Sequence, residues 1–160
     1  MIYVDSREKQ FQKESNVKIR NVSKYFEQNN IEYEVKKLEI GDYVNPQKQK
    51  FVIDKKKDLN EVQINLCSKD KSRFWREVRS AYKQGIKLVI LVEQSGITEL
   101  SDVVNWKSKY SCLDGKRLLK EMFRVATAYG IEWKFCDKRN TGKTICELLG
   151  VKKIDGYRRN

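Results

Sequence analysis

The spacing of apolar residues along the chain predicts strands of two kinds. Residues 87–92 are almost continuously apolar, as expected of a strand that helices cover on both faces. Apolar and charged residues alternate between positions 31 and 35, which predicts a half-exposed strand. Together with four other short apolar segments, the expected strands are 1–4, 31–35, a short one around 38–40, 51–53, 87–92 and 131–136.

Other segments repeat apolar residues every three or four positions, which is the spacing of an amphipathic helix. The expected helices are 17–29, 59–66, 74–82, 118–129 and 144–149. A glycine follows three of them, at Gly85, Gly130 and Gly150, where a left-handed residue commonly ends a helix. The order β-α-β-β-β-α-α-β-α-β-α predicts an α/β sandwich with a mixed central β-sheet flanked by α-helices. Residues 105–113 follow neither pattern.

Length and composition fit one domain, residues 1–150, followed by a short basic tail, 151–160. With one proline and eight glycines in 160 residues, no linker or low-complexity tract stands out. No apolar run approaches membrane-spanning length, and the opening residues MIYVDSREK lack the apolar stretch of a signal peptide. We therefore expect a cytoplasmic protein without membrane contact.

The chain contains no histidine, and its cysteines are widely spaced. The lack of histidine excludes Ser-His-Asp and Cys-His nucleophilic schemes, histidine-based ribonucleases and histidine-containing zinc sites. Because no CxxC pair occurs, the cysteines are interpreted as reduced, mostly buried thiols rather than zinc ligands or disulfides. They are Cys67, Cys112, Cys136 and Cys146. Any phosphodiester chemistry must therefore rely on carboxylates, lysine and a hard metal ion.

The balance of charge favours a polyanionic partner. There are 34 Lys and Arg residues against 22 Asp and Glu, which gives a net charge of +12 and a pI near 9.5. Neutralising phosphates releases condensed counterions, so such an excess favours nucleic acid. A generally lysine-rich proteome would give the same balance without any such partner.

Four acidic residues stand at or near the expected ends of strands: Asp5, Asp42, Asp54 and Glu93. Strand ends at one edge of an α/β sheet lie close together, and ligands bind at that edge. Carboxylates gathered there repel one another unless a cation lies between them, and Mg²⁺ prefers such oxygen ligands. Taken singly, each of these residues more often caps a helix or ends a strand.

The sharpest local feature is Asp54-Lys55-Lys56, directly after an apolar strand. Side chains alternate along a strand, so Asp54 and Lys56 are expected on the same face. Asp42 would then supply a second metal ligand. Without the strand and the two aspartates, Lys56 would be interpreted as a solvated lysine in the run Lys55 to Lys57.

These segments resemble the XPF-type structure-specific endonuclease domain of the PD-(D/E)XK nuclease superfamily. The similar segments are Val4-Asp5-Ser6-Arg7-Glu8, Gly41-Asp42-Tyr43, Asp54-Lys55-Lys56, Asp58, Arg73-Phe74 and Leu91-Val92-Glu93. The resemblance is in register over about residues 1–95, and residues 96–150 resemble shorter phage and mobile-element members. Asp54 and Lys55 stand where the family has glutamate and arginine, Asp58 lies closer to Lys56 than the family's aspartate, and no helix-hairpin-helix module follows.

The resemblance implies a restriction-endonuclease-like fold and Mg²⁺-dependent hydrolysis of DNA, with Mn²⁺ as a substitute ion. As metal ligands it implies Asp42 and Asp54, with Glu93 as a further one. Lys56 would orient the attacking water or stabilise the charged phosphate. Asp5 would ligate a second ion or order metal-bound water, and Arg7 would grip a phosphate or hold Asp42 by a salt bridge. Lys55, Arg73 and Trp106 are the expected DNA contacts.

The resemblance also implies branched or flap DNA as substrate, a role in repair or recombination, and a possible homodimer. A catalytically silent DNA-binding subunit of the same fold is the main alternative. A non-nuclease protein whose basic surface binds RNA or an acidic protein is the other. Residues 141–144 (Thr-Gly-Lys-Thr) lack the first glycine of a phosphate-binding loop, since Asp137 stands there. They are expected to begin a helix, and no nucleotide cofactor is expected.

Overall fold

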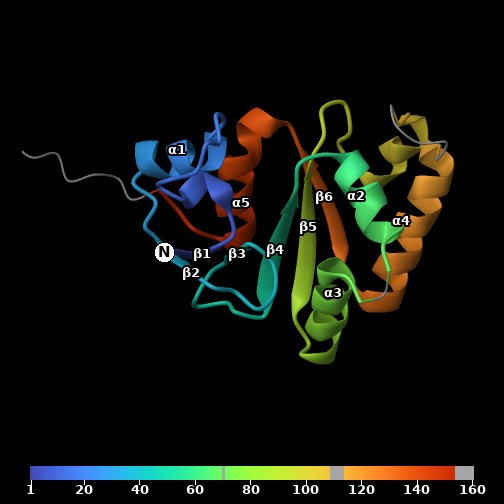
Figure 1. The fold of residues 1–160 in the computed structure, drawn as a ribbon, viewed down its shortest axis with the longest axis horizontal. Helices are drawn as coiled ribbons and strands as arrows, with labels where there is room; N and C mark the ends of the chain where they lie inside the picture. Colours follow the sequence, from blue (N-terminus) through green and yellow to red (C-terminus); the bar gives the residue numbers. More distant parts are fainter. Residues whose placement is uncertain (70, 109–113, 154–160) are drawn as a thin grey trace, which may run out of the picture.

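A mixed β-sheet runs through the protein in the computed structural model, which describes residues 1–69, 71–108 and 114–153. Within these residues the strand order is β2-β1-β3-β4-β5-β6 (Figure 1). The strands are β1 (Ile2–Asp5), β2 (Tyr33–Lys36), β3 (Tyr43–Val44), β4 (Phe51–Lys56), β5 (Lys87–Glu93) and β6 (Glu132–Cys136). Only β3 is antiparallel to its neighbours in this sheet, and the other pairs are parallel.

Helices cover both faces of the sheet, as Figure 1 shows. One face carries α1 (Asn21–Gln28) and α5 (Thr141–Leu149), and the other carries α2 (Leu59–Leu66), α3 (Arg73–Lys83) and α4 (Gly115–Tyr129). Three short 3₁₀ segments complete the described elements: η1 (Lys9–Phe11), η2 (Leu100–Asn105) and η3 (Lys138–Asn140). The expected α/β sandwich and its order of helices and strands are confirmed.

The core lies in two layers because alternate strand residues point to opposite faces. Val52, Leu88 and Ile90 pack under α2, α3 and α4, whereas Ile53, Val89 and Leu91 pack under α1 and α5. Strand β5 is buried on both faces, as its continuous apolar run predicts. No described helix has the length and apolarity needed to cross a membrane.

Helix α1 and the third strand begin later than expected, whereas helix α5 begins at an expected start. Helix α1 begins at Asn21 rather than 17, because the Arg20 side chain binds the carbonyl oxygens of Gln10, Gln12 and Ser15 and holds the preceding residues in a loop. The third strand begins at Tyr43 instead of around 38–40, since the Leu38 backbone is bound by side chains of the 5–7 segment. Helix α5 begins at Thr141, which confirms the helix start expected there.

Parts of the expectations lie outside the described residues. Cys112 and most of the unpatterned segment, 109–113, are among them, as are residues 154–160 of the basic tail. Among the described cysteines, Cys146 is buried, Cys136 is half-buried and Cys67 is exposed, and all three are free thiols.

Candidate active site

Strand direction brings the acidic residues to one edge of the sheet. Strands β1, β4 and β5 run parallel in the sheet and end at this edge with Asp5, Asp54-Lys55-Lys56 and Glu93. Strand β3 runs the opposite way, so it begins there, and Asp42 immediately precedes it. This edge therefore carries the last residues of three strands and the residue that precedes a fourth.

Asp42 is held against β4 by its backbone and its side chain. Its amide donates to the Ile53 carbonyl at 2.8 Å, and its Oδ2 accepts from the Lys55 amide at 2.8 Å. Gly41 has φ +70°, and a Cβ there would lie 2.9 Å from the Ile53 carbonyl oxygen. A larger residue would therefore push Asp42 away from β4, so glycine is required at this position.

The carboxylates of Asp42 and Asp54 face each other at this edge. The pKa of Asp42 is raised well above its ordinary value, first by burial and next by the negative charge of Asp54, with a further contribution from Glu8. Two carboxylates in contact, one buried and the other half-buried, are costly when both are ionised. A divalent cation between them would remove that cost.

Lys56 lies on the same face as Asp54, as the alternation of strand side chains predicts. Its Nζ is 3.1 Å from Asp54 Oδ2 and 3.9 Å from Glu61 Oε1, and it lies 5.5 Å from the centre of the Phe74 ring. Burial acts to lower the pKa of Lys56, but the charges of Asp54 and Glu61 outweigh it, and the net pKa is raised. Lys56 is therefore an ammonium at neutral pH, suited to hold negative charge rather than to remove a proton.

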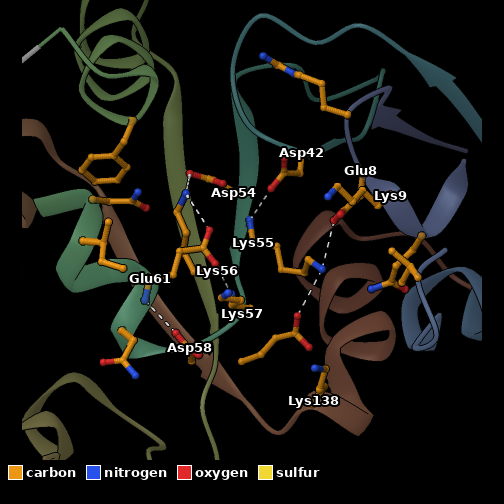
Figure 2. Close-up of a pocket in the computed structure, with 18 of the residues that line it drawn as sticks. Glu8, Lys9, Asp42, Asp54, Lys55, Lys56, Lys57, Asp58, Glu61 and Lys138 are labelled. Carbon is orange, nitrogen blue, oxygen red and sulfur yellow. Dashed lines mark hydrogen bonds and ion pairs between the residues drawn. The ribbon is translucent and has the colours of Figure 1, made fainter. Parts of the chain in front are cut away.

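A cleft of about 1070 Å³ opens over this group. Figure 2 shows Asp42, Asp54, Lys55 and Lys56 between a wall that carries Asp58 and Glu61 and a wall that carries Glu8 and Lys9. Eight basic residues line the cleft: Arg7, Lys9, Lys18, Lys55, Lys56, Lys57, Arg73 and Lys138. Five acidic residues besides Asp42 and Asp54 line it too, so basic residues outnumber acidic ones by eight to seven, and a cation bound at the carboxylate pair would make the cleft more attractive to a polyanion.

Asp5 is fully buried, and its carboxylate holds two arginines. Its Oδ2 accepts from Arg7 Nε at 2.6 Å and lies 3.6 Å from Arg73 Nη2. Glu77 Oε1 completes the group, at 2.9 Å from Arg73 Nε and 3.7 Å from Arg7 Nη2. The ion pairs of Arg7 are thus with Asp5 and Glu77 rather than with Asp42. Both arginines stay partly exposed and line the cleft.

Glu93 lines the same cleft but lies on the opposite face of the sheet from Asp54, and its expected role as a further metal ligand stays a prediction. Asp54 pairs with Ile90 and Lys55 with Leu91, so Glu93 shares the α1/α5 face with Lys55 and not with Asp54. Glu93 Oε1 is 3.4 Å from Lys55 Nζ, and Glu93 Oε2 accepts from the Thr141 hydroxyl at 2.9 Å.

Lys55 lines the cleft, and its ammonium group is paired with two carboxylates. Its Nζ lies 3.3 Å from Glu8 Oε2, as well as close to Glu93, and Glu8 Oε2 also accepts from the Tyr43 hydroxyl at 2.7 Å. Burial acts to lower the pKa of Lys55, but the charges of Glu8 and Glu93 raise it overall. The side chain joins the segment after β1 to β4 and β5.

The structure also places Trp106 and Asp58. Trp106 is half-buried against the core cluster under α4 and is not among the residues that line the cleft, so it is not placed to contact a nucleic acid there. Asp58 lines the cleft, but its Oδ1 accepts from the Glu61 amide at 2.8 Å as the N-cap of α2. Arg73, by contrast, lines the cleft as expected.

Some residues of the site carried little signal in the sequence. The only signal for Glu8 in the sequence is its place at the end of the segment 4–8. The only signal for Glu77 is its spacing of four residues from Arg73 on a helix. Lys9, Lys18 and Lys138 come to the cleft from 3₁₀ segments and a loop. Their placement depends on the packing of α1 and α5 on the sheet, which no local pattern reports.

The residues of the cleft fit a hard divalent ion. The carboxylates of Asp42 and Asp54 are oxygen donors, and no cysteine lines the cleft. Across residues 1–69, 71–108 and 114–153, no group of three or more Cys, Asp or Glu side chains is placed to hold an ion. The protein would thus supply two carboxylates, and Mg²⁺ characteristically keeps several waters.

Comparison with known proteins agrees with this geometry. The family model of the ERCC4 domain matches residues 4–148. No curated protein matches the chain. The fold is similar to two solved structures of XPF from Aeropyrum pernix, one free and one in a complex with DNA, at a TM-score of 0.65 for each and 19% and 17% identity. The alignments cover 92% and 94% of this chain but 62% and 63% of those chains, so this chain spans about three fifths of their length.

Proposed function

The chain belongs to the ERCC4 domain family, and from that premise we propose that it is a divalent-metal-dependent DNA endonuclease, acting on branched or flap DNA with Mg²⁺ as its ion. One observation carries the proposal: two facing carboxylates and an ammonium lie together at the floor of a cleft lined by eight basic residues. Two carboxylates can hold the metal ion and the ammonium can stabilise charge on the phosphate, and these are the groups that metal-assisted phosphodiester hydrolysis uses.

Asp42 and Asp54 are the residues that would hold the ion, with the Lys55 carbonyl as a further ligand. When bound, the ion lowers the pKa of a water, polarises the scissile phosphate and neutralises charge in the transition state. Hydrolysis adds the water oxygen to phosphorus and breaks one phosphodiester P–O bond, which leaves a phosphomonoester and a hydroxyl group.

The chain's own cations have separate roles in this proposal. Lys56 lies 3.1 Å from Asp54 and stays protonated, so it orients the attacking water or stabilises charge on the phosphate oxygens. Arg7 and Arg73, held by Asp5 and Glu77, present their partly exposed guanidinium groups to the cleft and grip flanking phosphates. Asp5 is thus a positioning residue for both arginines.

The proposal is tested by cleavage of a plasmid and a panel of branched oligonucleotides in a Mg²⁺ and Mn²⁺ titration. Asp54→Asn should lower the cleavage rate by at least about 100-fold while DNA binding survives, because it removes a charged ligand from a pair. Glu147→Gln is the matched control, since it removes one negative charge on α5 outside the residues that line the cleft.

The competing functions give different results in the same assay. Binding without cleavage in either metal would identify a silent DNA-binding subunit. No affinity for DNA at low salt would leave the non-nuclease alternative. Retention of Asp42, Asp54 and Lys56 in one constellation supports the active nuclease over the silent subunit.

A further inference from the structure

Two exposed apolar side chains line the candidate active-site cleft from different elements. Ile19, in the loop before α1, is 53% exposed, and Ile64, on α2, is 67% exposed. Both line the cleft that contains Asp42 and Asp54. Helix α2, which carries Ile64, and helix α1, which Ile19 precedes by two residues, pack on opposite faces of the sheet (Figure 1).

The fold does not require an apolar residue at either position. Helix α2 buries Leu59 and Val62 against the sheet, and Ile64 lies two residues further on, about 200° around the helix from Val62. β-Branched residues are also poorer helix formers than the polar residues that usually occupy an exposed helix face. Ile19 lies in a loop outside both core clusters.

Single exposed apolar residues are ordinary on protein surfaces, so the location of these two decides their meaning. Phe123 on α4 is exposed to a similar degree, at 63%, yet it does not line the cleft. Ile19 and Ile64 line the same cleft as the proposed catalytic group, and in that lining eight basic residues outnumber seven acidic ones. A ligand of that cleft must therefore combine negative charge with an apolar surface.

Nucleic acid has both properties only where its bases are unstacked. In a continuous duplex the faces of the bases are covered by their neighbours, and the exposed parts of the strand are phosphates, sugars and groove edges. Apolar side chains inserted beside a base step contact base faces that become free when stacking is broken. An unpaired nucleotide offers such faces with the least loss of stacking energy.

We propose that Ile19 and Ile64 contact the faces of unpaired bases next to the scissile phosphate, and so make the cleft prefer DNA with unpaired nucleotides over continuous duplex. The inference rests on the proposed nuclease function of the same cleft. It assigns the preference to two apolar side chains, separately from the basic residues, which attract any DNA.

The test uses the full chain carrying Asp54→Asn, so that binding is measured without cleavage. Two DNAs of equal length and charge are compared, a continuous duplex and a duplex with an unpaired segment that contains 2-aminopurine. Ile19→Ser and Ile64→Ser should each weaken binding to the unpaired DNA by roughly five- to tenfold, because an apolar contact is lost. Binding to the continuous duplex should stay unchanged, and the 2-aminopurine signal of the bound DNA should shift toward that of free DNA.

Two controls separate this contact from a loss of folding or charge. Phe123→Ser makes the same kind of change outside the cleft and should leave both affinities unaltered, whereas Ile64→Leu should restore the preference for unpaired DNA. The inference is overturned if the serine variants bind both DNAs like their parent, or if both affinities fall equally. Failure of the parent itself to bind any DNA at low salt would instead overturn the proposed function.

Discussion

At the scale of single residues, the site depends on the conflict between burial and charge at Asp42. Its carboxylate is held by the Lys55 amide in a position where Asp54 and Glu8 both oppose its ionisation. Lys56 relieves part of this repulsion by its ion pair with Asp54. The remainder is the physical reason to expect a cation at this point.

Because the pKa of Asp42 is raised, the free energy of unfolding of the metal-free protein should depend on pH. Above the ordinary pKa of 3.8, the unfolded chain has released the Asp42 proton while the folded chain still binds it. The free energy of unfolding should therefore fall as pH rises from that value toward the raised pKa, by up to about 1.4 kcal/mol per pH unit. Urea unfolding in a chelator at several pH values measures this slope.

Asp42→Asn is the comparison for that measurement, because it keeps the shape of the side chain and cannot titrate. The variant should lack the part of the slope that belongs to Asp42, so the two curves should converge toward low pH. If the curves of both proteins are parallel over the whole pH range, folding does not raise the pKa of Asp42.

At the scale of elements, strand direction and helix caps place the chemistry. The alternation of side chains along β4 is sufficient to predict from the sequence that Asp54 and Lys56 share a face. The same rule could not tell whether Glu93 shares a face with Asp54. That depends on the register between β4 and β5, in which Asp54 pairs with Ile90, and no local pattern gives the register. Asp42 was expected after a turn, but only the reversed direction of β3 explains why it reaches this edge.

Asp58 both caps helix α2 and lines the cleft, so its variants test whether it acts through the cap. Asp58→Ala should lower the free energy of unfolding by about 1 kcal/mol, because the N-cap of α2 is lost. Asp58→Asn keeps a capping oxygen and should retain the stability. Ser72→Ala is the matched control, because it removes the N-cap of α3 and should lower the free energy of unfolding in the same way. An unchanged free energy of unfolding in Asp58→Ala would contradict the cap assignment, and loss of metal-dependent cleavage in Asp58→Asn at unchanged stability would show a role beyond the cap.

At the scale of the whole molecule, the fold brings basic side chains from distant segments around the carboxylates of Asp42 and Asp54. Net charge and the absence of histidine were sufficient to predict a polyanionic partner and a carboxylate-based site. The composition could not show which lysines converge, because Lys18 and Lys138 reach the cleft from segments 120 residues apart in sequence. That convergence exists only once α1 and α5 have packed on one face of the sheet.

The salt dependence of DNA binding measures this convergence. Lys18→Gln and Lys138→Gln should each reduce the slope of log K against log salt by about 0.9, because each removes one phosphate contact. Lys120→Gln removes an exposed charge of α4 outside the cleft lining and should leave the slope nearly unchanged. Equal effects of all three variants would indicate general attraction by net charge rather than binding in the cleft.

The pairing of Asp42 and Asp54 around a divalent ion is tested most directly by calorimetric titration of the metal-free protein with Mg²⁺ and Mn²⁺. The unaltered chain should bind an ion at this pair, and Asp42→Asn and Asp54→Asn should each lower the affinity at least about tenfold, because each removes one of two charged ligands. Glu147→Gln should bind as the unaltered chain does. Undiminished metal affinity in both asparagine variants would contradict the account.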